Sequence, residues 1–133
     1  MRTLFRAFKK RADEQVDPAL RLSIHQFGLL YAIARKEEEV IQKDMAEMVG
    51  KDKSVILRLI DPLEEKELLR RVVDPKDRRK NYLMITKAGE RLVEQYLKIF
   101  YELVGDIQEG LSQAEIDTFR RVVGHLKGNL EKL

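Results

Sequence analysis

Two short apolar runs enclose a charged segment near the middle of the chain, "RRVVDPKDRRKNYLMIT" at residues 70–86. Six of the seven residues in "DPKDRRK" are charged. Apolar runs of this length around a polar loop predict a β-hairpin, with strands over about 69–73 and 80–85. By itself, the loop is consistent with a solvated hairpin tip or with a group of cations that bind phosphate. The elements around the hairpin distinguish these two interpretations.

Two amphipathic helices are expected at the start of the chain. Apolar residues recur on one side of residues 3–12, which predicts a short first helix. Ser23, followed three residues later by Gln26, has the sequence of a capping box, so a second helix is expected over about 24–35. Both patterns are typical of helices that place one face against a core.

A second pair of helices is expected immediately before the hairpin. The stretch "VIQKDMAEMVG" predicts a short helix over about 42–49, which Gly50 ends. A longer helix follows from about Lys53 to Glu67, with apolar residues on one face. We expect Pro62 to kink or break this helix, because proline removes a backbone donor.

Two further helices are expected after the hairpin. Thr86 can cap a long helix over about 87–109, which Gly110 ends, and "SQAE" at 112–115 is a second capping box. Apolar residues in the last helix alternate at spacings of 3 and 4, which is typical of a coiled-coil seam. The seam consists of Ile116, Phe119, Val123, Leu126, Leu130 and Leu133.

Composition narrows the class of protein and favours a polyanionic partner. A chain of 133 residues with 44% hydrophobic content is long enough for one domain with a core. Its net charge is only +3, but residues 68–80 carry six basic and two acidic side chains, a local sum of +4. The absence of cysteine excludes disulfides, and His25 and His125 lie far apart, so we expect neither a metal nor a cofactor. No apolar run approaches the roughly 20 residues of a membrane span, so we expect a cytoplasmic protein.

The order of the expected elements is helix, helix, short helix, helix, hairpin, long helix, helix. Its middle part corresponds to a helix-turn-helix followed by a two-stranded wing. A helix-turn-helix places its second helix in the major groove, where base edges can be read, and a wing can reach the neighbouring phosphates or minor groove. The basic loop stands where such a wing has its tip, which favours DNA binding over a solvated hairpin.

With its elements in this order, the sequence resembles the MarR family of winged-helix transcriptional regulators. The resemblance rests on "LSIHQFGLL" (22–30), "IQKDMAEMVGKDKSVILRLIDPLEEKELLRR" (41–71) and "DPKDRRKNYLMITKAGERL" (74–92). The segment "DPKDRR", followed by "ITKAG", is its most specific part. The resemblance implies one domain over 1–133 that is mainly α-helical with a small β-wing.

Within that domain, the resemblance implies a winged helix-turn-helix core at about 24–86 and dimerisation helices at 1–22 and 87–133. It further implies a homodimer on pseudo-palindromic double-stranded DNA, acting as a repressor and released by a small aromatic or phenolic effector. The dimer contacts are then expected at Leu4, Phe8, Ile116, Phe119, Val123, Leu126 and Leu130.

The resemblance also assigns roles to individual side chains. In the recognition helix, it places Lys53, Ser54, Val55 and Arg58 at the major groove, with Lys43 and Lys51 on phosphates. In the wing, Arg79 is expected to enter the minor groove, where the planar guanidinium fits better than a lysine, and Asp77 is expected to orient it. The remaining cations of the loop, expected on phosphates, are Lys76, Arg78 and Lys80.

Three departures from the family pattern affect the recognition helix. Val55 and Leu57 stand where hydroxyl residues are common, so readout is expected to rely on thymine methyl groups and DNA shape. Pro62 stands within a helix that the family usually continues. Glu67 replaces the usual glycine before the first wing strand, and it is strained if that position needs a positive φ.

Other interpretations remain open from the sequence. The apolar Val55 and Leu57 are also consistent with a winged-helix module that binds protein instead of DNA. The carboxylate clusters have no histidine or serine near them in the sequence, so nothing supports an enzyme. His25 lies in the region of the family's effector pocket, but a core or interface histidine is the favoured interpretation. Tyr31, Tyr96 and Phe100 are expected in the core.

Overall fold

The computed structural model describes residues 2–36, 40–41, 45 and 52–133. The chain divides into two compact units, Met1–Phe100 and Tyr101–Leu133. Across the described residues, no helix is long and apolar enough to cross a membrane.

The first unit begins with two of the expected helices. These are α1 (Arg2–Gln15) and α2 (Ile24–Arg35), separated by a short 3₁₀ turn at Pro18–Leu20. The capping box at the start of α2 is confirmed: the Ser23 hydroxyl accepts from the Gln26 amide at 3.1 Å, and the Gln26 side chain accepts from the Ser23 amide at 2.8 Å. The helix expected over 42–49 lies outside the described residues except for Met45, which is helical and buried.

The helix before the hairpin is α4 (Lys53–Glu65). The break considered at Pro62 is absent, because α4 continues through the proline to Glu65. Proline removes one hydrogen bond of the ladder, and the burial of Ile60 and Leu63 on the inner face of α4 offsets that loss. After the helix, Glu67 has a φ of 59°, a left-handed conformation that a non-glycine residue adopts only with strain.

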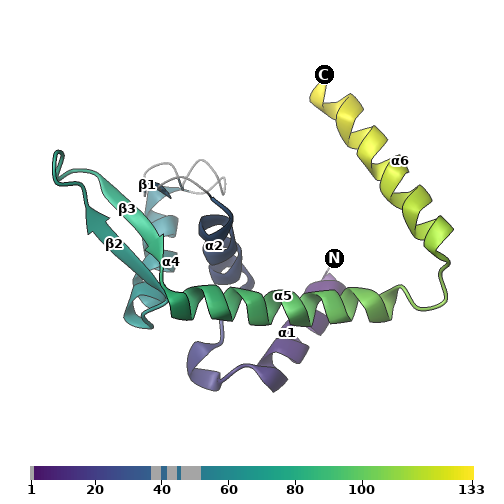
Figure 1. Ribbon diagram of the computed structural model, residues 1–133, viewed down its shortest axis with the longest axis horizontal. Helices are drawn as coiled ribbons and strands as arrows, with labels where there is room; N and C mark the ends of the chain where they lie inside the picture. Colours follow the sequence, from purple (N-terminus) through teal and green to yellow (C-terminus); the bar gives the residue numbers. More distant parts are fainter. Residues whose placement is uncertain (1, 37–39, 42–44, 46–51) are drawn as a thin grey trace. The chain divides into compact units, whose positions relative to one another are not determined.

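The sheet contains the expected hairpin and one strand that the sequence did not predict. β2 (Leu69–Val73) and β3 (Asn81–Ile85) pair antiparallel, with Arg71 opposite Leu83 and Val72 opposite Tyr82. The additional strand, β1 (Val40–Ile41), pairs with the other edge of β3, so the strand order is β1-β3-β2. In Figure 1, the tip of the hairpin extends away from α2 and α4.

The hairpin is fixed to the start of α5 (Lys87–Ile107) by a small set of close contacts. The Thr86 amide donates to the Leu68 carbonyl at 3.2 Å, and the Thr86 hydroxyl donates to the Glu67 carbonyl at 2.7 Å. The same hydroxyl accepts from the Gly89 amide at 3.0 Å, as expected for a helix cap. A Cβ at Gly89 would lie 2.2 Å from the Leu68 carbonyl oxygen, so the close packing requires glycine here.

The core of the first unit lies where α2, α4, the sheet and α5 meet. α2 packs against α4 and β3, and α4 packs against β2. An aromatic cluster joins α1, α2 and α5: the Phe8 ring contacts Phe27, Tyr96 and Phe100 with centroids 5.4–6.0 Å apart. The largest fully buried side chains are Leu29, Leu30, Met45, Ile56, Ile60, Leu63, Leu68, Leu69 and Ile99.

The second unit contains the end of α5 and helix α6 (Gln113–Glu131). Gly110, with a φ of 91°, occupies the turn between them, and the predicted capping box of Ser112 and Glu115 is confirmed. The apolar seam of α6 is largely uncovered in the single chain, with Phe119 70% exposed. The other exposed apolar residues of this unit are Tyr101, Ile107, Leu111, Val122, Val123, Leu126, Leu130 and Leu133.

Candidate nucleic-acid interface and apolar pocket

The outer face of α4 presents polar side chains at the start of the helix. Ser54 and Arg58 are exposed, whereas Val55 and Leu57 are half-buried. The opposite face carries Ile56, which is buried. Side chains at i and i+4 share a face of a helix, so Ser54 and Arg58 lie together. The side chains of Lys43, Lys51 and Lys53 lie outside the described residues.

The tip of the hairpin is shaped by hydrogen bonds within the loop itself. The Asp74 amide donates to the Lys80 carbonyl at 3.0 Å, and the Lys80 amide donates to the Asp77 carbonyl at 3.0 Å. The Asp74 carboxylate accepts from the Lys76 amide at 2.7 Å, and the Asp77 carboxylate accepts from the Arg79 amide at 3.0 Å. Aspartates that bind the backbone two residues further on form Asx-turns, which fix the course of a loop.

Arg79 pairs with Asp77 at the tip while its side chain remains exposed. Its guanidinium Nε lies 3.4 Å from Asp77 Oδ1, and its side chain is 92% exposed. The contact restricts the base of the guanidinium while the rest of the group remains in solvent. Asp77 thus contacts both the backbone and the side chain of Arg79. The other cations of the loop, all exposed, are Lys76, Arg78 and Lys80.

A tyrosine braces the base of the tip. The Tyr82 phenol donates to Asp74 Oδ2 at 2.7 Å, so both carboxylate oxygens of Asp74 are hydrogen-bonded. The hydrogen bond from Tyr82, with a smaller contribution from the Lys76 amide, holds the pKa of the Asp74 carboxyl below its ordinary value of 3.8. Asp74 therefore remains an anion at neutral pH, and it can hold the tip in one conformation.

Asp74 and Tyr82 are positioning residues that our sequence reasoning missed. The signal was available, because Asp before Pro75 and Lys76 is a typical Asx-turn sequence. Alternation along the strand also places Asp74 on the same face as Val72, and Tyr82 lies opposite Val72 in the hairpin. The sequence alone did not show which residues of the two strands lie opposite each other, because this register depends on where the loop ends.

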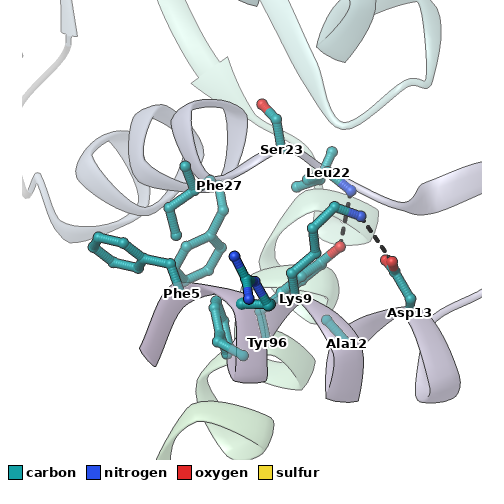
Figure 2. A pocket seen from close by; sticks show the side chains of 11 residues that line it. Phe5, Lys9, Ala12, Asp13, Leu22, Ser23, Phe27 and Tyr96 are labelled. Carbon is teal, nitrogen blue, oxygen red and sulfur yellow. Dashed lines mark hydrogen bonds and ion pairs between the residues drawn. The ribbon is translucent and has the colours of Figure 1, made fainter. Parts of the chain in front are cut away.

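The largely apolar pocket of the first unit lies between α1, α2 and α5. It has a volume of about 420 Å³, and its lining includes the aromatic rings of Phe5, Phe8, Phe27 and Tyr96. Figure 2 shows Lys9 and Asp13 at the same pocket, with their ion pair of 2.7 Å drawn dashed. Two of the residues expected in the core, Tyr96 and Phe100, belong to the aromatic cluster beside it.

Hydrogen bonds connect this pocket to the end of α4. The Tyr96 hydroxyl accepts from the Leu22 amide at 2.8 Å, and burial raises the pKa of the Tyr96 phenol, which keeps it protonated. Next to Leu22, the Arg21 guanidinium donates to the Asp13 carbonyl at 2.6 Å. The Arg21 carbonyl in turn accepts from Lys66 Nζ at 3.1 Å, immediately after α4. The segment before α2 therefore contacts both the pocket wall and the helix beside the wing.

The residues predicted at the dimer contact differ in how much side-chain surface they expose. Phe8 is buried against aromatic rings of its own chain, so its side chain has almost no free surface. Leu4 and Ile116 are half-buried, and the remaining seam residues of α6 are exposed. Within the second unit, Val104, Ile107, Leu111, Ile116 and Phe119 line an apolar groove.

The described ranges contain no group of three His, Asp or Glu side chains that could hold a metal ion. His25 is exposed at the start of α2 and is therefore not a core residue of the single chain.

Comparisons with known proteins agree with this geometry. The family model described as "MarR family" matches residues 22–80. Transcriptional regulator PA3341 has a TM-score of 0.73 and 25% identity, over 99% of this chain and 93% of that one. A MarR family transcriptional regulator from Rhodococcus sp. RHA1 has a TM-score of 0.73 and 26% identity, over 93% of this chain and 84% of that one.

A third similar structure was determined with nucleic acid. It is a variant of MepR from S. aureus bound to an oligodeoxyribonucleotide, with a TM-score of 0.69 and 22% identity, over 97% of this chain and 91% of that one. The family model covers α2, α4, β2 and the loop of the hairpin, and the solved structures share the fold along nearly the whole chain. Residues 22–80 are therefore similar to the MarR family, and the chain shares the winged-helix fold of solved transcriptional regulators.

Proposed function

We propose that the protein is a sequence-specific DNA-binding repressor that acts as a homodimer. The observation that carries this proposal is the wing tip, where a preformed loop presents the exposed cations Lys76, Arg78, Arg79 and Lys80. A loop already fixed by its own hydrogen bonds loses little conformational freedom on binding, which favours affinity. The MepR variant bound to an oligodeoxyribonucleotide supports DNA as the partner, because it has the same fold.

The wing and α4 divide the recognition of DNA between them. Arg79 enters the minor groove, where a narrow, electronegative slot attracts a guanidinium, and Asp77 keeps it oriented. The α4 residues assigned to the major groove are Lys53, Ser54, Val55 and Arg58, and the methyl groups of Val55 suit contact with thymine. The cations assigned to phosphates are Lys43, Lys51, Lys76, Arg78 and Lys80.

A second copy of the chain covers the apolar seam of α6. Phe119 and Leu126 are 70% and 57% exposed, and a patch of large apolar side chains on a single chain favours burial against a partner. Leu4 and the remaining α6 residues Ile116, Val123 and Leu130 complete the contact. The domain accordingly has a winged helix-turn-helix at about 24–86, flanked by dimerisation helices at 1–22 and 87–133. Two-fold symmetry then places two recognition helices about 34 Å apart on a pseudo-palindromic operator.

A small aromatic or phenolic effector binds the pocket between α1, α2 and α5. The four aromatic rings suit a planar ligand, and Arg6 and Lys9 suit a carboxylate or phenolate on it. Binding there disturbs the contacts of Asp13 and Leu22, and Arg21 transmits the change to Lys66 at the end of α4. An effector that favours another position of α4 releases the DNA by population shift.

As a repressor, the dimer occupies its own promoter or an adjacent one and excludes polymerase until the effector releases it. Because its partner is chromosomal DNA, its location is the cytoplasm. The protein has no catalytic role in this scheme.

The test is fluorescence anisotropy on the upstream DNA of its own gene against a scrambled duplex, across a salt series. About six or more phosphate contacts in a dimer give a steep dependence, with a slope of about −0.9 in log K against log salt for each neutralised phosphate. Absence of salt-dependent binding to any duplex would sink the DNA proposal. That result would favour the alternative, a winged-helix module that binds protein instead of DNA. Val55 and Leu57 supply the apolar part of α4 that such a module would use.

A further inference from the structure

Arg71 of β2 reaches back to α4 and contacts two of its carboxylates. Its guanidinium donates to Glu64 Oε1 from Nε at 3.2 Å and from Nη2 at 2.9 Å. Nη2 also donates to Asp61 Oδ1. The backbone amide of Arg71 donates to the other Glu64 oxygen at 3.1 Å, so Glu64 holds both the side chain and the main chain of this strand residue.

The register of the hairpin explains why Arg71, and not its neighbour, makes these contacts. Arg71 lies opposite the buried Leu83, on the face of the sheet that meets α4. Arg70 lies opposite Met84, which is 55% exposed, on the solvent face. The two arginines therefore carry the same charge at adjacent positions, but only one of them joins the wing to α4.

The contacts span the corner where the chain passes from α4 to β2. Pro62, between the two carboxylates in sequence, removes one hydrogen bond from the last turns of α4. Glu67 then turns the chain with a φ of 59°, a conformation that a glutamate adopts only under constraint. Backbone bonds also cross this corner, such as that from the Leu68 amide to the Leu63 carbonyl at 3.0 Å. The ion pairs of Arg71 add side-chain bonds that restrict the angle between the helix and the strand.

The ion pairs of Arg71 with Glu64 and Asp61 are better suited to orienting the wing than to stabilising the fold. Glu64 and Asp61 are 38% and 57% exposed, and ion pairs open to solvent contribute little to the free energy of unfolding. The hydrogen bonds from Arg71 hold the pKa of the Glu64 carboxyl below its ordinary value, so the pair is ionised at neutral pH. Several charge-assisted bonds from one planar guanidinium define a geometry, which a single lysine contact does not.

We propose that Arg71, held by Glu64 and Asp61, is a positioning residue that fixes the angle between α4 and the wing. When that angle is fixed, the α4 side chains and Arg79 can bind DNA at the same time. When the angle varies, α4 and the wing bind DNA independently of each other. This inference rests on the proposed DNA-binding function for its consequence, but the positioning itself is measurable without DNA.

The first test measures the angle directly. Because the chain has no cysteine, spin labels can be attached specifically at Ser54→Cys on α4 and Lys76→Cys at the wing tip. Pulsed electron paramagnetic resonance should give a narrow distance distribution, which Arg71→Gln broadens and the matched control Arg70→Gln leaves unchanged. Glu64→Gln provides a second, milder variant if Arg71→Gln does not fold. Equal distributions in all folded variants would overturn the proposal.

The second test is a double-mutant cycle with Arg79→Ala, read as affinity for a duplex that the wild-type protein enriches from a random-sequence pool. Arg71→Gln should weaken binding about tenfold, within the range of energies measured between interacting residues. In the Arg71→Gln background, Arg79→Ala should lower DNA affinity much less than in the wild-type protein. The reason is that the wing no longer binds DNA together with α4. Arg70→Gln should combine additively with Arg79→Ala.

The outcomes separate the inference from the function on which it rests. Additive effects of Arg71→Gln and Arg79→Ala on DNA affinity, with both variants folded, would mean that Arg71 acts on stability alone and would overturn positioning. If the wild-type protein enriches no duplex, the proposed DNA-binding function fails, and the distance distributions still decide whether Arg71 fixes the angle.

Discussion

The Tyr82 phenol donates a hydrogen bond of 2.7 Å to Asp74, across the end of the wing hairpin. Asp74 uses its second carboxylate oxygen to bind the Lys76 amide, so one anion joins the strand to the loop. The cations of the tip therefore extend from a loop that is ordered before any partner arrives.

Tyr82→Phe removes this brace with little change in shape. We expect weaker DNA binding, because the loop must be ordered at the time of association, and only a small change in thermal stability, because the contact is partly exposed. Affinity by anisotropy and melting by circular dichroism measure the two effects. Asp74→Asn should act in the same direction. Unchanged affinity in both variants would show that the Tyr82–Asp74 hydrogen bond does not contribute to DNA binding.

Arg79 and Arg78 should differ in what they contribute to binding. Arg79→Ala should lower the preference for A·T-rich flanking sequence, because a guanidinium in the minor groove responds to groove width. Arg78→Ala should weaken binding to all duplexes alike and reduce the salt slope by about 1.8, because each subunit of the dimer loses one phosphate contact. The measurement is the affinity of each variant for a set of duplexes with varied flanking sequences. An equal loss of the A·T preference in both variants would contradict the assignment of Arg79 to the minor groove and Arg78 to phosphate.

Leu126→Glu should convert the dimer to monomer or aggregate. The substitution places a charge in the centre of the α6 seam, where burial against a second copy would desolvate it. Lys127→Ala, at the next position and off the seam, should leave the dimer intact. Sedimentation velocity distinguishes the two, and a wild-type-like dimer in Leu126→Glu would rule out the seam as the interface.

The contribution of Glu64 to stability should depend on pH in one direction. Its pKa in the folded protein is lowered from the ordinary value of 4.5, mainly by the hydrogen bond from Arg71, so the unfolded chain takes up the proton first as pH falls. The stabilisation is therefore present above about pH 4.5 and is lost as pH falls through the lower, folded value. Melting temperature against pH should fall less steeply in Glu64→Gln than in the wild-type protein. Parallel curves would show that the pair does not affect stability.

Gly89→Ala should destabilise the fold, whereas Gly28→Ala should not. A Cβ at Gly89 would lie 2.2 Å from a backbone oxygen, and overpacking of this kind costs about 1–3 kcal/mol. Gly28 is also helical but has open space around its Cβ position, so alanine there should stabilise by about 0.5–1 kcal/mol. Urea unfolding compares the two, and similar midpoints would contradict the close contact.

The features that the sequence predicted well are those set by neighbouring residues. The capping boxes at Ser23 and Ser112 follow from side chains three positions apart, and both are present. The hairpin was located to within one residue, because its apolar runs are short and bounded by charge. The resemblance identified Glu67 as a position that is strained if its φ is positive, and its φ is 59°.

The features that it missed depend on contacts between distant segments. β1 has only two residues, too few to show alternation, and it forms because β3 offers a free edge. The bond between Leu22 and Tyr96 joins positions 74 residues apart. At Pro62, local reasoning favoured a kink or break, and the break is absent because burial of the neighbouring apolar residues keeps α4 continuous. In the candidate site, Asp77 and Arg79 were proposed from a motif, but Tyr82 required the strand register.

The backbone of the wing tip is held by bonds that begin and end between Asp74 and Tyr82, and none of these bonds involves a core side chain. Evolution can therefore exchange the outward cations Lys76, Arg78 and Lys80 one at a time without repacking the protein. If the proposed function holds, such exchanges change the strength and salt dependence of DNA binding, because phosphate contacts carry no sequence information, while the pocket remains as it is. Copies of the gene would then differ in affinity for DNA and still respond to the same signal.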